Sequence, residues 1–152
     1  IISLSPKKQE IQPLLDKIFI QYNQKADSKD LYLNTVKTDA TAVFDEKWTL
    51  EALCNIVDNA IKYTVTGGIS INVIVYEFFV RIDISDTGIG ISDNEHEKVF
   101  SRFYRSEKAN TTEGVGIGLY LARKIITGEN GYIKVSSLPE HGSTFSVFLS
   151  KL

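Results

Sequence analysis

The chain has 152 residues, 43% hydrophobic and 24% charged, a composition typical of one globular domain and not of a disordered or fibrous protein. A total of 17 Lys and Arg against 19 Asp and Glu gives a net charge of −2, so no overall positive field favours nucleic acid as a partner. No apolar run reaches the roughly 18 residues that a membrane-spanning helix needs.

The first part of the chain predicts two helices separated by short strands. Pro13 suits the first turn of a helix, and apolar residues recur at helical spacing over 12–26. Looser alternation predicts strands over 30–37 and 42–44. The segment 46–63 is the clearest helix, because apolar residues form a stripe along one side of it. That stripe comprises Leu50, Leu53, Val57, Ala60 and Ile61.

The middle of the chain predicts a pair of strands followed by a helix. Apolar and polar residues alternate over 69–75 and again over 80–84, and a turn near Glu77 separates the two runs. The stretch from Ser92 to Glu95 has the S-x-x-E form of a capping box. We therefore expect a helix to begin there and to run towards residue 103.

The last part of the chain completes the expected fold. A polar loop over 106–115 precedes a predicted helix over 118–127, and strands are expected over 132–137 and 144–149. We predict an α+β fold, a two-layer α/β sandwich in which a mixed sheet carries helices on one face. Residues 1–152 contain no repeat or linker, so we expect a single domain. The lack of any methionine leads us to expect a piece of a longer protein.

Polar residues share one face of the 46–63 helix, opposite its apolar stripe. Asn55, Asn59 and Tyr63 are spaced four apart, and Lys62 lies three after Asn59. Asparagine is a mediocre helix former, so two of them one turn apart indicate either a solvated face or a ligand site. An amide oxygen is a hard, neutral ligand that suits Mg²⁺, and a lysine can meet a phosphate.

Two glycine-rich segments follow. Asp86 stands at a strand end, and Gly88 and Gly90 come directly after it. A carboxylate in such a turn can accept a hydrogen bond from an amino group such as N6 of adenine, although an ordinary turn has the same form. Residues 114–119 carry three alternating glycines before a helix, which suits a phosphate-binding loop. The spacing fits neither a Walker A motif nor a Rossmann fingerprint.

Taken in this order, the segments resemble the catalytic ATP-binding domain of sensor histidine kinases. The wider group includes gyrase B, the Hsp90 chaperones and MutL, and shares the Bergerat ATP-binding fold. The matching motifs are an N box at 55–63, a G1 box at 86–91, an F box at 100–105, a G2 box at 114–119 and a terminal strand motif at 142–145. Each motif is weak alone, but five in register over residues 12–149 are highly specific.

The resemblance implies a role for each matching residue. Asn59 would bind Mg²⁺ and, with Asn55 and Lys62, would form the catalytic group around the phosphates of ATP. Asp86 would bind the adenine N6 amino group, with Thr144 assisting through a water molecule. The other nucleotide contacts would come from Tyr63, Gly88, Gly90, Ile91, Tyr104, Arg105, Gly114, Val115, Gly116, Gly118 and Leu119.

The resemblance also separates two kinds of chemistry. In the ATP-hydrolysing relatives a Glu stands four residues before the Mg²⁺-binding Asn and activates water, whereas this chain has Asn55 there. An amide is a poor general base, which favours phosphoryl transfer to a histidine on a separate dimerisation domain. Neither His96 nor His141 lies in a segment of that kind. We therefore expect ATP binding with very slow hydrolysis.

The implied partners lie outside this chain. They are the kinase's own dimerisation and phosphoacceptor domain and, through the full-length kinase, a response regulator. We expect the chain itself to be monomeric, because dimerisation would come from the separate dimerisation domain. One cysteine and no signal peptide lead us to expect a cytoplasmic domain, and the parent protein is expected to be a membrane-anchored sensor. Two other readings remain, a gyrase B- or MutL-like ATPase domain and a degenerate module that binds partners without ATP. Asn55 argues against the first, and the intact glycine motifs argue against the second.

Overall fold

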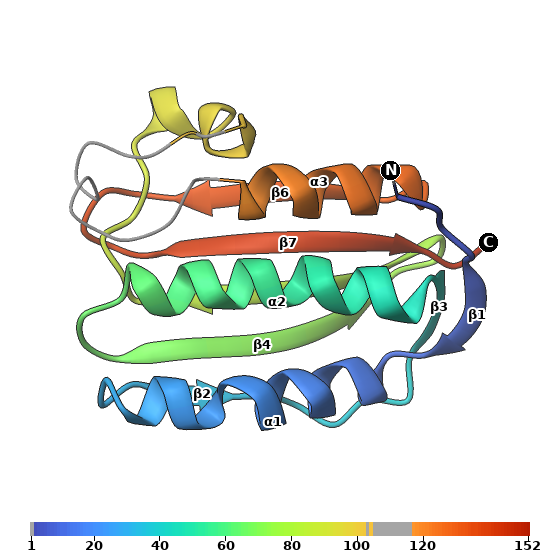
Figure 1. Ribbon diagram of the computed structural model, residues 1–152, viewed down its shortest axis with the longest axis horizontal. Helices are drawn as coiled ribbons and strands as arrows, with labels where there is room; N and C mark the ends of the chain where they lie inside the picture. The colour runs from blue at the N-terminus through green and yellow to red at the C-terminus, as the bar shows by residue number, and fades with distance from the viewer. Residues whose placement is uncertain (1, 103, 105–116) are drawn as a thin grey trace.

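The computed structural model describes residues 2–102, 104 and 117–152, in two layers (Figure 1). The helices α1 (Gln12–Asp27), α2 (Glu46–Lys62) and α3 (Gly118–Gly128) lie side by side on one face of a β-sheet. All three agree with the predicted helices to within one residue at each end. The predicted two-layer sandwich with helices on one face is therefore confirmed.

The main sheet has five strands in the order β2-β4-β5-β7-β6. They are β2 (Tyr32–Asn34), β4 (Gly68–Val75), β5 (Phe79–Asp86), β6 (Tyr132–Ser137) and β7 (Ser143–Ser150). The β2 strand runs parallel to β4, and the other neighbours are antiparallel, so the sheet is mixed, as predicted. β2 is shorter than the 30–37 strand expected from the sequence.

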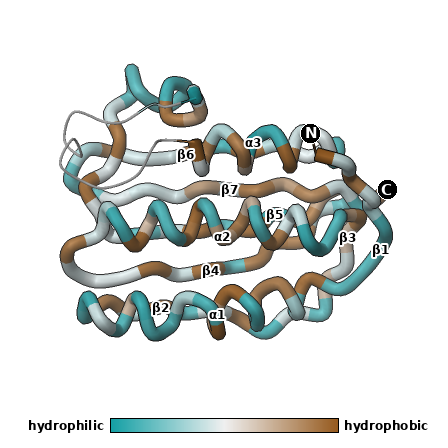
Figure 2. The backbone as a smooth tube through the Cα atoms, viewed as in Figure 1, coloured by the Kyte–Doolittle hydropathy of each residue, from teal (hydrophilic) through white to brown (hydrophobic). Residues whose placement is uncertain are grey.

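The core lies between the helices and the sheet. Each helix in Figure 2 alternates between hydrophobic and hydrophilic residues, and most of the hydrophobic ones are buried in the core, with Phe19 and Ile20 of α1 exposed. Burial of one large aliphatic side chain stabilises a fold by about 1.5–3 kcal/mol. The largest fully buried side chains include Leu14, Leu15 and Ile18 of α1, Leu53, Ile56 and Ile61 of α2, and Ile69, Ile71, Ile82 and Ile84 of the sheet.

A second, two-stranded sheet stands at one end of the molecule. In it β1 (Lys7–Glu10) pairs antiparallel with β3 (Thr41–Phe44). The β1 strand was not predicted, because the sequence Lys-Lys-Gln-Glu has no apolar alternation. Its strand conformation therefore depends on the partner strand and not on a buried face of its own.

Two acidic side chains tie this end together. Asp45 caps α2 by accepting from the N–H of Trp48 at 2.9 Å, and its other oxygen accepts from the N–H of Ser5 at 2.8 Å. Glu129, buried after α3, accepts from the N–H of Asp45 at 2.5 Å and from the hydroxyl of Thr49 at 2.6 Å. The start of the chain, the start of α2 and the end of α3 thus meet at one place.

The helix predicted from Ser92 is wrong. The structure has two short 3₁₀ turns there instead, η1 (Asp93–Glu95) and η2 (Lys98–Phe100). The Ser92 hydroxyl bonds to the side chains of Asn94 and Glu95 and makes no capping bond to the backbone. The Ser92 and Glu95 side chains therefore bond to each other and do not form the capping box that the sequence pattern predicts.

Candidate functional site

The polar face of α2 carries the residues that the sequence predicts to bind phosphate and Mg²⁺. Asn55, Asn59, Lys62 and Tyr63 all lie on α2 or at its end and are half-buried. Among the residues that the structure describes, the side chains of Asn55 and Asn59 make no hydrogen bond. Both amide groups are therefore available to a ligand.

The start of α3 lies against this face. The atoms nearest to the open side of Gly118 belong to Asn55, and a Cβ at Gly118 would lie 3.6 Å from the Cβ of Asn55. Leu119, the next residue, packs on the core. The first N–H groups of a helix have no partner within it and carry a partial positive charge. The structure thus brings an anion-attracting helix end beside Asn55, one turn before Asn59 on α2.

Asp86 ends β5 at the same end of the molecule. Its Oδ1 accepts from the N–H of Gly88 at 2.8 Å and from the N–H of Ser143 at 3.2 Å. Burial raises the pKa of the Asp86 carboxyl, and these two hydrogen bonds offset only part of that rise. With Oδ1 held by the backbone, Oδ2 remains to accept a hydrogen bond from a ligand.

The loop after Asp86 is fastened to the end of α2. The N–H of Ile89 donates to the carbonyl of Tyr63 at 3.2 Å. Gly88 lies so close to the same carbonyl that any side chain at this position would collide with it. This contact explains the first glycine of the segment, and it places Asp86 next to the polar face of α2.

The second glycine is required by the β6–β7 turn. Gly90 has a φ of +73°, and a Cβ there would collide with the carbonyl oxygen of Leu138. The N–H of Glu140 donates to the carbonyl of Ile89 at 2.7 Å, which holds this turn against the loop.

Gly90→Ala is expected to lower the free energy of unfolding by at least about 2 kcal/mol, because the side chain meets both a left-handed φ and a carbonyl oxygen. Thermal or urea unfolding measures the loss. Gly118→Ala is the matched control, since a Cβ there meets only ordinary contacts and should be neutral or slightly stabilising. Equal stability of the two variants would contradict the packing described for Gly90.

Serine hydroxyls complete the wall beside Asp86. The N–H of Ile91 donates to the Ser137 hydroxyl at 2.7 Å, and the Ser137 and Ser143 hydroxyls lie 2.9 Å apart. Ser143 is buried and stands opposite Asp86 in the β5–β7 register. Sequence reasoning missed Ser143. Only the strand register, which puts Asp86 and Ser143 on one side of the sheet, identifies it.

The side chain of Thr144 lies on the other face of the sheet from that of Asp86. Successive side chains of a strand point to opposite faces, so Thr144 faces away from the helices, where its hydroxyl bonds to that of Ser85 at 2.8 Å. Both hydroxyls belong to the outer face of the sheet. Thr144 still lines the same cavity as Asp86, so its water-mediated role at the adenine stays a prediction, while Ser143 is the residue paired with Asp86 across the two strands.

A cavity of about 460 Å³ opens beside Asp86. It lies between η1 and the turn that joins β6 to β7, and both histidines of the chain contribute to its wall. The lining residues are Asp86, Asp93, His96, Val135, Ser136, Ser137, Leu138, His141, Gly142, Ser143 and Thr144. Open space therefore exists next to the carboxylate that the sequence singled out.

Lys62 is engaged by a neighbour. Its ammonium lies 3.3 Å from Oδ2 of Asp58, one turn earlier on α2. The carboxylate also binds Lys25 of α1. Lys62 lies at the end of α2, where the sequence predicts the phosphate site, but its ammonium is paired with Asp58 of the same helix.

The remaining predicted contacts lie in or next to the segment outside the described residues. Tyr104 packs on the core, and its hydroxyl donates to the Glu95 carboxylate. The predicted contacts Arg105, Gly114, Val115 and Gly116, together with the predicted loop over 106–115, lie outside the described residues.

Comparison with known proteins identifies the family to which the chain belongs. The family described as histidine kinase-, DNA gyrase B-, and HSP90-like ATPase matches residues 44–152, so the chain belongs to that family. Within it, the chain is an ATP-binding catalytic domain of the sensor histidine kinase kind. The expected Bergerat fold is likewise confirmed.

The relatives are sensor kinases. Adaptive-response sensory kinase SasA of Microcystis aeruginosa is 35% identical over 147 residues, covering 94% of this chain and 38% of that protein. Sensor-like histidine kinase SenX3 of Mycobacterium tuberculosis is 33% identical over 150 residues, covering 94% and 36%. The chain thus spans little more than a third of these relatives. Full-length ShkA in complex with AMPPNP has the same fold, with a TM-score of 0.86 at 23% identity over 97% of this chain and 31% of that one.

Proposed function

We propose that this chain binds ATP with Mg²⁺ and positions the γ-phosphate for transfer to a histidine on a separate dimerisation domain. The observation that carries the proposal is the convergence of three features at one end of the fold. They are the free oxygen of Asp86, the two unpaired amides of Asn55 and Asn59, and the start of α3 at Gly118. The AMPPNP complex of ShkA supports a nucleotide as the ligand.

Adenine fits the Asp86 wall. Its N6 amino group would donate a hydrogen bond to Oδ2 of Asp86. The buried Ser143 hydroxyl would hydrogen-bond to a ring nitrogen directly or through water. Guanine has a carbonyl oxygen where adenine has this amino group. Two hydrogen-bond acceptors, the guanine oxygen and Oδ2 of Asp86, would then face each other. A buried acceptor left without a donor is costly, and this cost would exclude GTP.

The residues present fit Mg²⁺ bound together with phosphates. Mg²⁺ prefers oxygen ligands and takes most of them from phosphate groups and water. Asn59 would contribute its amide oxygen, with Asn55 beside it, and the described residues contain no cluster of three or more acidic, His or Cys side chains that could hold a metal ion by themselves. The ion would neutralise charge on the phosphates, so its binding should require the nucleotide.

The chemistry left to the domain is positioning. Asn55 cannot act as a general base, and Glu51, a turn earlier, is exposed. Lys62, Tyr63 and the start of α3 at Gly118–Leu119 would surround the phosphates. In phosphoryl transfer such placement and charge neutralisation provide most of the catalysis.

The rest of the parent protein would supply the partners. We propose that it carries the dimerisation and phosphoacceptor domain, that its response regulator acts through that domain, and that it is a membrane-anchored sensor with this domain in the cytoplasm. Of the helices in the part of the chain that the structure describes, none has the length and apolar character of a membrane span.

Calorimetric titration with ATP and GTP in the presence of Mg²⁺, followed by a hydrolysis assay, tests the proposal. ATP should bind at least about 100-fold more tightly than GTP, with hydrolysis near background, and a phosphoacceptor domain from the parent kinase should gain the phosphoryl group. Steady hydrolysis would favour an ATPase domain. Absence of nucleotide binding would favour an interaction module.

A further inference from the structure

Asp58 lies between two cations that come from different helices. Its Oδ2 is 3.3 Å from the ammonium of Lys62, and its Oδ1 binds the ammonium of Lys25 on α1. The carboxylate is partly buried, with 26% of its side chain exposed. Burial acts to raise the pKa of Asp58, but the hydrogen bond from Lys25 and the charge of Lys62 outweigh it and lower the pKa.

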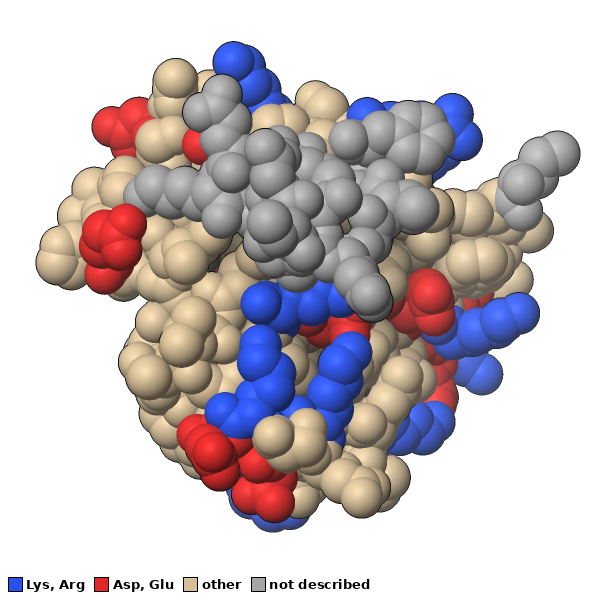
Figure 3. All heavy atoms as spheres, turned by 60° about the vertical axis from the view of Figure 1, so that its left-hand side comes forward, with Lys and Arg blue, Asp and Glu red and all other residues tan. Residues whose placement is uncertain are grey.

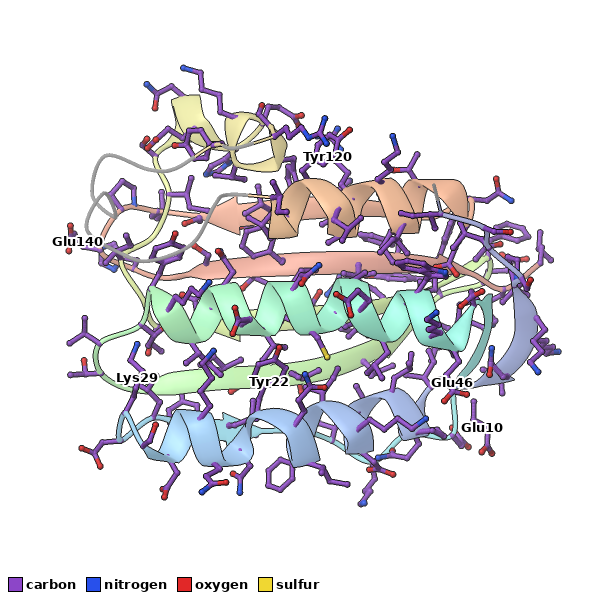
Figure 4. All side chains as sticks on the ribbon, viewed as in Figure 1. Glu10, Tyr22, Lys29, Glu46, Tyr120 and Glu140 are labelled. Carbon is purple, nitrogen blue, oxygen red and sulfur yellow. The ribbon has the colours of Figure 1, made fainter. Side chains whose placement is uncertain are left out.

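Lys25 is held in place independently of Lys62. Its ammonium lies 5.9 Å from the centre of the Tyr22 ring, within the range of a cation–π contact, and Tyr22 projects between α1 and α2 (Figure 4). Lys29 donates to the carbonyl of Ile61 at 2.5 Å, so the end of α1 is fixed to the end of α2. Basic side chains gather at this end of the molecule, with acidic ones beside them (Figure 3).

The pairing sets a condition on any movement of Lys62. A phosphate would compete with Asp58 for the Lys62 ammonium, and full engagement of the phosphate would draw the ammonium away from Asp58. If Asp58 had no other partner, that step would expose a partly buried carboxylate without a counter-charge, close to an anionic ligand. Lys25 removes this cost, because it uses the other oxygen of the same carboxylate and can stay when Lys62 leaves.

We propose that Lys25 is a positioning residue for the nucleotide, which acts through Asp58 to release Lys62 towards the phosphates. This inference rests on the proposed ATP site. It assigns a role to α1, a helix whose residues none of the sequence motifs include. Lys25 itself does not contact the ligand, so its effect must depend on both Asp58 and the phosphate groups.

A double-mutant cycle tests the coupling by calorimetry with Mg²⁺-ATP. Lys25→Gln is expected to weaken ATP binding about three- to fivefold, the size typical of a partly exposed ion pair. In the Asp58→Asn background the same change should have no effect, because Lys62 is then already free. Lys25→Arg should restore the affinity, and adenosine, which has no phosphate, should bind all variants equally in a competition titration.

Lys17→Gln is the matched control. Lys17 forms an ion pair with Glu46 between the same two helices, at the opposite end of α2, so its loss reproduces any general effect on the α1–α2 contact without touching Asp58. It should leave ATP affinity unchanged. An equal loss for Lys25→Gln in both backgrounds would reveal only a long-range charge effect, and either that result or no loss at all would overturn the inference. Failure of the unmodified chain to bind ATP would instead overturn the proposed function.

Discussion

Asp86→Asn is expected to reduce ATP affinity by at least about 100-fold, equivalent to roughly 3 kcal/mol. In the native side chain Oδ1 accepts from the N–H groups of Gly88 and Ser143, and in the proposed complex Oδ2 would accept from the adenine. The amide can keep the two backbone bonds only by placing its oxygen at the Oδ1 position. Its NH₂ group then faces the adenine amino group, so that two donors oppose each other.

The measurement is a calorimetric titration with ATP, together with thermal unfolding to confirm that the variant is folded. Asp83→Asn is the matched control, because Asp83 is an acid on the same strand but faces the other side of the sheet, where it pairs with Arg81. That variant should bind ATP as the native chain does. An Asp86→Asn variant within threefold of native affinity would show that this carboxylate does not read the adenine.

The second large effect is expected for Asn59→Ala. Loss of its amide oxygen should remove the increase in ATP affinity that Mg²⁺ produces and should slow phosphoryl transfer in the full-length parent kinase by ~10²–10³. Adenosine binding should persist, because the Asp86 wall is unchanged. Titration of ATP with and without Mg²⁺ separates the two contributions.

Asn72→Ala provides the comparison for Asn59→Ala, since Asn72 is an exposed asparagine on β4 and has no place in the proposed site. It should change neither quantity. If the Mg²⁺ effect survives in Asn59→Ala but disappears in Asn55→Ala, the metal ligand is Asn55, and the assignment made from the motif is one turn out of place.

Local patterns predicted most of the fold. The stripe on α2 and the alternation in β4, β5 and β7 are properties of short windows, and the structure agrees with them. The β1 strand and the turns after Ser92 could not be read in this way. The Lys7–Glu10 strand exists because β3 pairs with it, and the Ser92 hydroxyl has side-chain partners that compete with the capping bond.

The candidate site was likewise predictable only where it depends on short sequence patterns. Asp86 and the two asparagines stand in motifs whose spacing is visible in the sequence. Ser143 was missed because its position beside Asp86 depends on the register of β5 against β7. The engagement of Lys62 was equally hidden, since the second partner of Asp58 is Lys25, which lies 33 positions away in the chain.

The hydrogen bonds of Asp45 fix the position of the amino-terminal segment relative to the proposed nucleotide site. The N–H of Ser5 is held at the first turn of α2, whereas Asn59 and Asp86 lie near its other end (Figure 1). A helix of 17 residues is about 25 Å long. An acceptor histidine that reaches this site from the amino-terminal side must therefore be carried across that distance, which takes at least about seven extended residues or a helix as long as α2. The length and stiffness of the preceding connection, and not only the site itself, would then govern whether a given acceptor can be reached.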